Sequence, residues 1–424
     1  LVEEGKAYPV FTTKEELEKI KSTDKKSENS EKDWDGAAQE RREQQTRQRA
    51  ITLEEVERHL TAGDPYSLNI LADGDGEKKL KFTDLIKGTL ELPENDEDFV
   101  LLKSDGIPTY HFAHAVDDHL MGTTHVVRGE EWLPSLPKHL QLFRYLGFKP
   151  VKYMHIAQLM RLDENGSKKK LSKRDMGANL NDYERMGYAP ECVAEYVMTL
   201  LNSNFEEWHE KFPDKDINEF PFSVEKMNQS GALFDKDKLH NICKNELSKL
   251  SEEELYDFLY DWAKENEPEN VEKWFGDREK MLQILRLYMG VGAKRRRKDL
   301  MYAKQIFELI SYFFDGESAE EMDEFKLDED MVSKILKSYL AKYDHNDDNS
   351  VWFNKLKEIA DEHGFASDMK AYKANPENFK GNVSDIAEAV RIAVTGRANT
   401  PDLWTIVHIM GEEQMTERIK KHIK

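Results

Sequence analysis

The chain has 424 residues, which is enough for two to four domains of about 100–200 residues each. Its 62 Lys and Arg against 83 Asp and Glu give a net charge of −21 at pH 7, and 39% of its residues are hydrophobic. The 7 Trp, 16 Tyr and 20 Phe supply enough apolar surface for packed cores, which excludes a disordered chain. No apolar run approaches the ~18–20 residues of a membrane-spanning helix, so we exclude a transmembrane protein.

The first hundred residues mix helical and strand-like segments. The sequence predicts a capped helix over residues 12–22, a highly charged loop or exposed helix over 22–50, and an amphipathic helix over Ile51–Leu60. Two short strands follow at Tyr66–Leu71 and Leu80–Phe82, separated by the turn signal DGDG.

From Phe99 onward the pattern of predicted elements changes. A buried strand, an Asp-Gly/Pro turn, a helix and the strand HVVRG follow one another, which indicates part of a βαβ unit. After Trp132 come a helix at Pro137–Leu146, the strand-like KYMHIAQLM and a loop rich in Gly, Ser and Lys. From about Tyr183 onward nearly every segment has the 3.6-residue period of a helix, as in APECVAEYVMTLL, REKMLQILRLYMGV, MVSKILKSYLAKY and DIAEAVRIAVTG. The predicted fold is therefore a mixed α/β region followed by a long all-α region.

Basic residues gather in three places despite the acidic balance. These clusters are Arg41, Arg42, Arg47 and Arg49; Lys168, Lys169, Lys170, Lys173 and Arg174; and Lys294, Arg295, Arg296, Arg297 and Lys298. A charge run by itself is more often a solvated surface than a nucleic-acid site, and both alternatives stay open for the third cluster. The second cluster lies in GSKKKLSKRD, with five cations in seven residues around Ser172. Lysines and a hydroxyl in such a loop suit a pyrophosphate, although Lys-rich surface loops are common.

The segments around this loop resemble a known family. TYHFAHAVDDHLMGTTHVVRGEEWLPSLPKHLQLFRYLGF and the following MHIAQLMRLDENGSKKKLSKRD resemble the class I glutamyl-tRNA synthetases, in which the second half of a Rossmann domain leads into a K-[LIM]-S-K-[RS] signature. The resemblance implies a connective, tRNA acceptor-binding α+β insertion at 1–99, the second Rossmann half at 100–150, a stem-contact region with the KLSKR loop at 151–245, and an α-helical anticodon-binding domain at 246–424.

The family's early HIGH-type motif has no counterpart in this sequence. The chain opens with LVEEGKAYPVF, without an initiator Met or a signal sequence. We therefore expect that the first Rossmann half is missing, and that these residues alone bind tRNA in a salt-sensitive way without activating an amino acid.

The resemblance also implies a glutamate-binding site made by Tyr110, His114 and Arg128. Arg128 ends the HVVRG strand, and its planar guanidinium can pair with the glutamate side-chain carboxylate; the alternative is a local pair with Glu130 or Glu131. Tyr110 corresponds to a tyrosine that contacts the amino acid. His114 lies one helical turn further on, where bacterial glutamyl enzymes more often have Asn, so its role is left open.

The ATP site and the catalytic loop are implied in the same way. Trp132 corresponds to a tryptophan beside the ATP pocket, Leu159 and Met160 to backbone that meets adenine, and Lys173 also contacts ATP. The residues implied to stabilise the departing pyrophosphate are Lys170, Ser172, Lys173 and Arg174.

Metal ligands are not expected in this chain. Asp117, Asp118 and His119 are consecutive and cannot face one ion from a helix, so we expect them to make capping and local hydrogen bonds. The stretch AYPVFTTKEEL lacks the cysteines with which some relatives bind zinc, and the two cysteines of the chain, Cys192 and Cys243, are too few for a Cys-rich zinc site or a disulfide framework. Mg²⁺ is expected with ATP, held mainly by phosphates and water.

The predicted function is that of a glutamate–tRNA ligase: ATP-dependent activation of L-glutamate to glutamyl-adenylate, and transfer to the 3′ end of tRNA(Glu). A glutaminyl-tRNA synthetase and a non-catalytic tRNA-binding fragment are the alternatives. We expect a cytoplasmic monomer with no membrane partner, since the scarcity of cysteines is typical of a reducing compartment.

Overall fold

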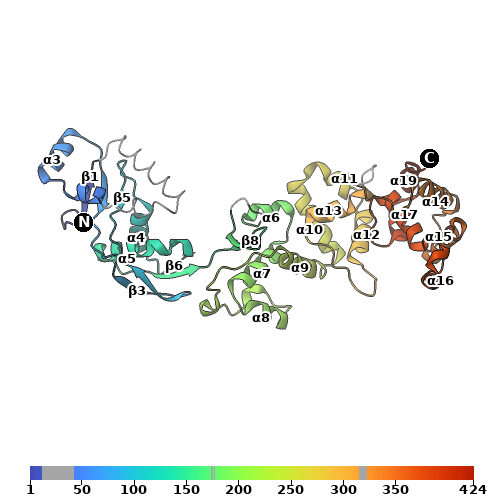
Figure 1. Cartoon of the computed structure of the whole chain (residues 1–424), viewed down its shortest axis with the longest axis horizontal. Coiled ribbons are helices and arrows are strands. Elements are labelled where there is room, and N and C mark those ends of the chain that lie inside the picture. The colour runs from blue at the N-terminus through green and yellow to red at the C-terminus, as the bar shows by residue number, and fades with distance from the viewer. Residues whose placement is uncertain (12–42, 173–174, 176, 315–321) are drawn as a thin grey trace. The chain divides into compact units, whose positions relative to one another are not determined.

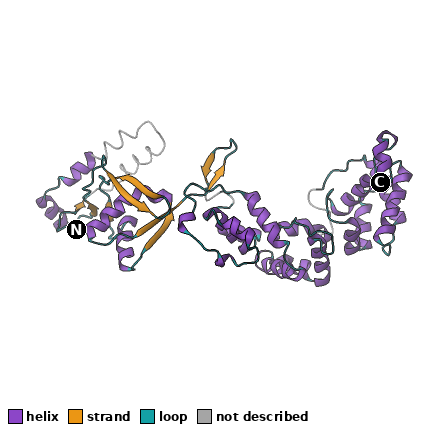
Figure 2. Cartoon of the chain, turned by 90° about the horizontal axis from the view of Figure 1, so that it is seen from below, coloured by secondary structure: helices purple, strands orange, loops and turns teal. Residues whose placement is uncertain are grey.

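The computed structural model describes residues 1–11, 43–172, 175, 177–314 and 322–424 (Figure 1). It divides into two compact units. The first unit comprises residues 1–171 and 198–234, and the second unit comprises 172–197 and 235–424. Figure 2 shows that the strands gather in the first unit, whereas helices make up the second.

In the described residues of the first unit, the strands form four small groups. The strands are β1 (Ala7–Val10), β2 (Ser67–Ile70), β3 (Lys79–Asp84), β4 (Gly88–Pro93), β5 (Val100–Leu102), β6 (His125–Gly129), β7 (Lys152–Ile156), β8 (Met160–Leu162) and β9 (Lys168–Lys170). They form an antiparallel sheet in the order β1-β2-β5, the hairpins β3-β4 and β8-β9, and the parallel pair β6-β7. The predicted strands at Tyr66–Leu71 and Leu80–Phe82 are thus confirmed.

The βαβ unit lies elsewhere than the sequence indicated. β5 and β6 flank a helix, but β5 pairs with β2 and β6 pairs with β7, so the predicted unit around that helix is wrong. The parallel pair is closed instead by β6, α5 (Leu136–Leu146) and β7. Its register places Arg128 opposite His155. A strand of three residues such as β5 has too little pattern to reveal its partner.

The first unit also contains helices, two of which supply buried residues to its apolar core. The helices are α3 (Leu53–Ala62), α4 (Tyr110–Leu120), α5, α8 (Phe205–Lys211) and the short 3₁₀ segments Glu130–Ser135, Ile217–Glu219 and Val224–Lys226. α3 begins with a reciprocal capping box between Thr52 and Glu55, as the predicted amphipathic helix requires. The core includes Ile70, Leu101 and Phe143, all fully buried, so the β1-β2-β5 sheet and α5 pack together.

The turn of the β3-β4 hairpin is built on one buried carboxylate. Oδ1 of Asp84 accepts from the N–H groups of Ile86 and Lys87 at 2.9 and 2.8 Å. Gly88 completes the turn with a φ of 75°, which glycine adopts without steric cost. The turn is fastened to β7 by the Leu85 N–H, which donates to the Tyr153 carbonyl at 3.0 Å.

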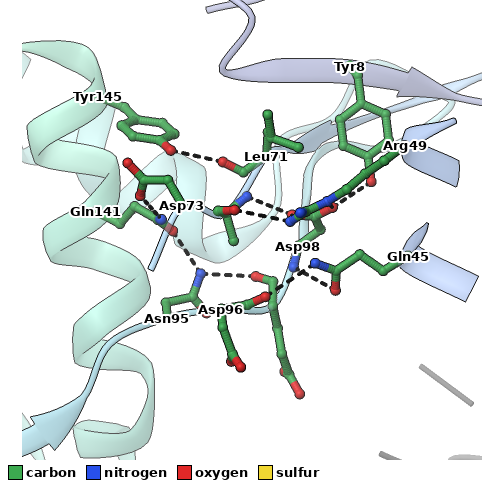
Figure 3. A network of polar contacts seen from close by, with 12 residues as sticks. Tyr8, Gln45, Arg49, Leu71, Asp73, Asn95, Asp96, Asp98, Gln141 and Tyr145 are labelled. Atoms are coloured by element: carbon green, nitrogen blue, oxygen red, sulfur yellow. Dashed lines mark hydrogen bonds and ion pairs between the residues drawn. The ribbon is translucent and has the colours of Figure 1, made fainter. Parts of the chain in front are cut away.

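A second buried carboxylate, Asp98, joins separate parts of the first unit (Figure 3). It accepts from the Tyr8 hydroxyl at 2.7 Å, from Nε and Nη2 of Arg49 at 2.7 and 2.6 Å, and from the Ala72 N–H at 2.6 Å. Each oxygen therefore has two donors, which compensates for its removal from water.

The same network extends to α5 through Gln141 (Figure 3). Its amide donates to Asp73 at 2.7 Å and accepts from Asn95 at 2.7 Å. Arg144, one turn further along α5, also binds Asp73 and lowers the pKa of that carboxyl to about 2. These bonds fix α5 and hence the buried His139 that it carries.

The second unit consists of helices around a large apolar core. They are α6 (Leu180–Met186), the adjoining α7 (Pro190–Leu201), α9 (Lys236–Leu247), α10 (Glu252–Asn266), α11 (Val271–Phe275), α12 (Arg278–Met289), α13 (Ala303–Ile310), α14 (Glu329–Lys342), α15 (Asn349–His363), α16 (Met369–Ala374), α17 (Val383–Thr395), α18 (Leu403–Met410) and α19 (Glu412–Lys420), with 3₁₀ turns at Pro268–Asn270, Ser311–Phe313 and Pro376–Asn378. The four periodic segments named from the sequence lie in α7, α12, α14 and α17, so the predicted helical region is confirmed. Among the described residues, no helix is both long and apolar enough to cross a membrane.

Some sequence predictions fall on residues that are not described. The helix at 12–22, most of the charged stretch 22–50, and the cations Lys173 and Arg174 lie there.

Candidate functional site

Arg128 occupies the carboxyl end of β6, where open α/β sheets place ligand-binding residues. Its Nε–H donates to Nε2 of His155 at 3.0 Å, and Nη1 lies 3.1 Å from Nδ1 of His139. Nη2 reaches the Trp132 carbonyl at 3.5 Å, and the guanidinium lies over the ring of Tyr153, 4.8 Å from its centroid. All four partners are uncharged or can be uncharged, so the positive charge of Arg128 is not neutralised by them.

The local carboxylates are occupied by other groups. Glu130 pairs with Lys87 and accepts from the Gln158 N–H at 3.2 Å. Glu131 accepts from the Gln158 side chain at 2.9 Å. Within the described residues Arg128 forms no ion pair, so the alternative of a local pair with Glu130 or Glu131 is wrong. A half-buried guanidinium without a carboxylate is prepared for an anionic ligand.

The hydrogen bonds of Arg128 determine which ring nitrogen carries the proton in two histidines. A guanidinium can only donate, so Nε2 of His155 and Nδ1 of His139 must both accept. His155 then carries its proton on Nδ1, which donates to Asp84 at 2.7 Å. His139 carries its proton on Nε2, which lies 2.9 Å from Nδ1 of His111. Burial lowers the pKa of His139 to about 2, in accord with a neutral ring.

Two predicted site residues, Tyr110 and Trp132, lie together beside the guanidinium. Their ring centroids are 4.5 Å apart. Tyr110 is the first residue of α4 and is 47% exposed, so part of it is accessible to a ligand. The sequence assigned Tyr110 to glutamate and Trp132 to ATP; in the structure their rings contact each other, and the Trp132 carbonyl is bonded to Arg128.

His114, the third predicted glutamate residue, lies under Tyr110, with ring centroids 5.9 Å apart. Its Nδ1 binds Asp118 at 2.7 Å and its Nε2 binds the Tyr153 hydroxyl at 2.7 Å. Burial lowers the pKa of His114, while the Asp118 charge opposes this. Both ring nitrogens of His114 are therefore bonded within the protein, and its ring supports that of Tyr110. Asp118 thus makes a hydrogen bond within its own helix, as expected. The ring of His119 stacks on Phe148, with 3.7 Å between centroids, which is a packing contact and not the expected hydrogen bond.

Sequence reasoning did not identify Asp84, His139, Tyr153 and His155. A signal for His155 existed, because HVVRG and KYMHI were both expected as strands and their carboxyl ends meet at one edge. His139 and Tyr153 are fully buried and could not be distinguished from core residues.

The β8-β9 hairpin carries the start of the KLSKR loop. Lys170 ends β9 opposite Met160, and its side chain is exposed. The Gln158 hydrogen bond and the charge of Lys170 both lower the pKa of Glu131, so the hairpin lies near the β6 end. In the second unit, the Ser172 N–H donates to Asp175 at 2.7 Å. Lys173 and Arg174 lie outside the described residues.

Backbone bonds hold the segment expected to meet adenine. The Met160 N–H donates to the Ala232 carbonyl at 2.9 Å, and the Met160 carbonyl accepts from Phe234 at 2.8 Å. The Leu159 carbonyl accepts from Leu171 at 2.9 Å. Across the described part of the chain, the Leu159 N–H has no hydrogen-bond partner, which leaves one main-chain donor for a ligand.

A basic groove of about 740 Å³ lies in the second unit, between the end of α12 and α18. Arg286, Arg295 and Arg297 line it together with Asp402, Thr405 and His408. Arg286 pairs with Glu252, and Arg297 pairs with Asp299. Part of the third basic cluster has structural bonds: Arg296 donates to the Leu250 carbonyl at 2.8 Å, and Lys298 donates to Asn245 at 2.7 Å. The cluster is therefore split between a groove wall and helix-end contacts.

Comparison with known families matches nearly the whole chain. Residues 1–241 match the family described as tRNA synthetases class I (E and Q), catalytic domain, and residues 254–423 match the anticodon binding domain. The glutamate–tRNA ligase of Acetivibrio thermocellus is 48% identical over 424 residues, which cover 99% of this chain and 76% of that protein. The glutamate–tRNA ligase of Clostridium perfringens strain SM101 is 42% identical, covering 100% of this chain and 76% of that protein.

Solved structures of similar fold include the glutamate–tRNA synthetase of Elizabethkingia anophelis. It is 25% identical, with a TM-score of 0.64, and the match covers 99% of this chain and 79% of that one. The glutamate tRNA ligase of Elizabethkingia meningosepticum, solved in complex with its amino acid, has a TM-score of 0.63 at 24% identity, covering 98% and 79%. The second of these supports the fold alone.

Proposed function

The chain belongs to the glutamate–tRNA ligases, a family of class I tRNA synthetases, and on that premise we propose that the complete enzyme, with both Rossmann halves, catalyses the ATP-dependent attachment of L-glutamate to tRNA(Glu). The observation on which the proposal rests is the unpaired positive charge of Arg128. Its guanidinium is half-buried, held by neutral groups, and unpaired with any carboxylate of the described residues. A ligand carboxylate would supply the missing counter-charge.

The proposed reaction has two steps. In the first, an oxygen of the glutamate α-carboxylate attacks the α-phosphorus of ATP, and the bond to the β-phosphate oxygen breaks to release pyrophosphate. In the second, a 3′-terminal hydroxyl of tRNA attacks the carbonyl carbon of glutamyl-adenylate, loses its proton, and AMP leaves. Neither step needs a covalent bond to the protein, so the protein acts by positioning and charge stabilisation.

Each predicted site residue has a part in this proposal. Arg128 holds the side-chain carboxylate of glutamate, while Tyr110 and His114 form the wall of its pocket. Trp132 bounds the ATP side, and Leu159 and Met160 present backbone to adenine. The residues proposed to stabilise pyrophosphate as it departs are Lys170, Ser172, Lys173 and Arg174. Mg²⁺ would enter with ATP, held by phosphate oxygens and water.

The tRNA is proposed to contact several parts of the chain, along the fourfold division 1–99, 100–150, 151–245 and 246–424. The groove lined by Arg286, Arg295 and Arg297 supports contact with the anticodon side, since guanidinium groups suit both phosphates and bases. We propose that the enzyme acts as a cytoplasmic monomer without zinc.

The glutaminyl enzyme is the nearest alternative. The side chain of glutamine is neutral, so bound glutamine would leave the charge of Arg128 unpaired. This disfavours the glutaminyl enzyme. All described elements of 235–424 are helices, in keeping with the expected helical anticodon-binding region. A non-catalytic tRNA-binding role is disfavoured because Arg128, Tyr110 and Trp132 assemble a pocket that tRNA binding alone would not need.

The test of the proposal is amino-acid-dependent ATP–pyrophosphate exchange by the complete enzyme, with both Rossmann halves, carrying Arg128→Gln; Arg58→Gln, on the exposed face of α3, is the charge-matched control. We expect exchange with glutamate to be lost in Arg128→Gln and retained in the control, while tRNA binding stays intact. Unchanged exchange with glutamate in Arg128→Gln would refute the proposal.

A further inference from the structure

The guanidinium of Arg128 is held by a buried chain of hydrogen bonds that begins at Asp84. Asp84 and His155 are both fully buried at their side chains, and Oδ2 of Asp84 accepts from Nδ1 of His155 at 2.7 Å. The same oxygen also accepts the His155 N–H at 3.1 Å, so the ring and its backbone are bonded to one carboxylate. This arrangement fixes the tautomer of His155 and presents its Nε2 lone pair to Arg128.

His139 restrains the guanidinium from a second side. Its Nδ1 accepts from Nη1 of Arg128 at 3.1 Å, and its ring is fully buried between α4 and α5. Nε and Nη1 are thus bonded to two imidazoles that come from different elements, β7 and α5. Two fixed acceptors at different nitrogens of one planar group determine its orientation as well as its position.

These bonds leave two donors for a ligand. Of the five N–H groups of a guanidinium, three point to His155, His139 and the Trp132 carbonyl. The remaining pair comprises one N–H on each terminal nitrogen, which is the number that a carboxylate accepts in a bidentate pair. An amide side chain offers one oxygen and one NH₂ group, and its NH₂ would face a donor.

We propose that His155, oriented by Asp84, and His139 are positioning residues that set the Arg128 guanidinium for a bidentate pair with a carboxylate, and thereby select glutamate over glutamine. This inference rests on the proposed function, because it gives Arg128 the glutamate side chain. It assigns a role to three residues that touch neither the substrate nor the reacting atoms.

The chain allows a matched pair of substitutions at His155. Asparagine can place its NH₂ near Nδ1 and keep the bond to Asp84, but it has no atom at the Nε2 position. Glutamine reaches further and can offer its amide oxygen to Arg128. Loss of a hydrogen bond to a charged group costs about 10-fold or more in affinity. We expect His155→Asn to raise the KM for glutamate at least to that extent and to reduce glutamate–glutamine discrimination, with the KM for ATP unchanged, and His155→Gln to restore part of the loss.

Several outcomes would overturn the proposal. An unchanged KM for glutamate in His155→Asn would do so, and so would equal rises in the KM values for glutamate and ATP, which indicate general disruption. If the His155 variants do not fold, His139→Leu and His139→Asn repeat the comparison, since asparagine keeps an acceptor near Nδ1 and leucine does not; equal KM values for glutamate in these two would overturn it.

The result can be separated from failure of the proposed function. If Arg128→Gln retains glutamate exchange, the proposed function fails. If Arg128→Gln loses exchange while His155→Asn behaves as the parent enzyme, only the positioning role fails.

Discussion

Arg128 and His155, two side chains usually regarded as bases, are bonded as donor and acceptor across 3.0 Å, from facing positions of two parallel strands. The contact holds only while the imidazole is neutral, because a protonated ring would direct N–H against N–H. The site therefore keeps a positive charge next to several imidazoles, and this arrangement has consequences for stability as well as for recognition.

The first prediction concerns acid stability and His139. Its pKa falls from 6.5 to about 2 in the folded chain because of burial, so the unfolded chain binds a proton below pH 6.5 that the folded chain does not. The free energy of unfolding should thus decrease as pH falls below 6.5, by about 1.4 kcal/mol per pH unit from this residue alone. Urea unfolding of the parent and of His139→Gln between pH 7 and 5 measures how the free energy of unfolding depends on pH in each protein. A variant as pH-sensitive as the parent would contradict the prediction.

The second prediction concerns the buried carboxylate of Asp98. Asp98→Asn replaces an acceptor oxygen with an NH₂ group that faces donors from Tyr8, Arg49 or Ala72. Arg49 is one-third exposed, so water screens part of the loss, and we expect the free energy of unfolding to fall by about 2–3 kcal/mol. Glu91→Gln is the control.

In that control the substitution breaks the exposed pair with Lys81, which should matter by less than about 1 kcal/mol. Thermal and urea unfolding of both variants decides the matter. Equal effects would show that the Asp98 network adds no stability.

The third prediction compares two glycines that end helices. Gly187 has a φ of 75°, and a Cβ there would lie 2.5 Å from the Cβ of Ala303 and 2.8 Å from Nε1 of Trp262. Gly364 has a φ of 79°, but its nearest neighbour is the flexible end of Lys380 at 3.7 Å. At either position, alanine should lower the free energy of unfolding by about 1–2 kcal/mol, because the backbone there is left-handed. At Gly187, crowding should lower it by about a further 1–3 kcal/mol.

Gly187→Ala should therefore lower the unfolding midpoint clearly more than Gly364→Ala, as followed by circular dichroism. The reverse order would mean that the contact of α6 with Trp262 and Ala303 is looser than described.

The fourth prediction concerns the basic groove. Arg295 is exposed and forms no ion pair within the described residues, so Arg295→Gln removes a charge without breaking a structural bond. If it contacts tRNA phosphate, binding should weaken and the slope of log affinity against log salt should decrease by about 1. Lys334→Gln, on an exposed position of α14 away from the groove lining, is the control. Filter binding at several salt concentrations measures both, and an unchanged salt slope in Arg295→Gln would assign Arg295 to the solvated surface.

The fifth prediction concerns the pyrophosphate loop. If Lys173 stabilises the charge that develops as pyrophosphate leaves, Lys173→Ala should lower the maximal exchange rate by about 10²–10³ without raising the KM for glutamate. Lys168→Ala, in strand β9 just before the loop and outside the implied signature, should have a much smaller effect. Equal losses in the two variants would show that only the total charge of the loop matters.

The sequence predicted the helices of the second unit well, because periodicity and caps are local. Ser251 with Glu254 and Asn382 with Asp385 form reciprocal capping boxes at the starts of α10 and α17. It also placed Arg128 at the end of a strand, which β6 confirms, whereas the role of Arg128 in binding glutamate came from the family resemblance.

What the sequence could not provide was pairing through space. β5 joins β2 across a stretch of more than twenty residues, and His155 meets Arg128 only through the register of two strands. The division between the two units also has no local signal, since it falls within the KLSKR loop and within α7.

The carboxylate of Asp84 connects the β3-β4 hairpin to Arg128, although the hairpin and Arg128 are far apart in the sequence. Its two oxygens serve different structures, the turn amides on one side and His155 on the other. Fraying of this turn and loosening of the pocket are therefore a single event. We therefore expect that local opening of this turn weakens the binding of the anionic substrate before the first unit unfolds.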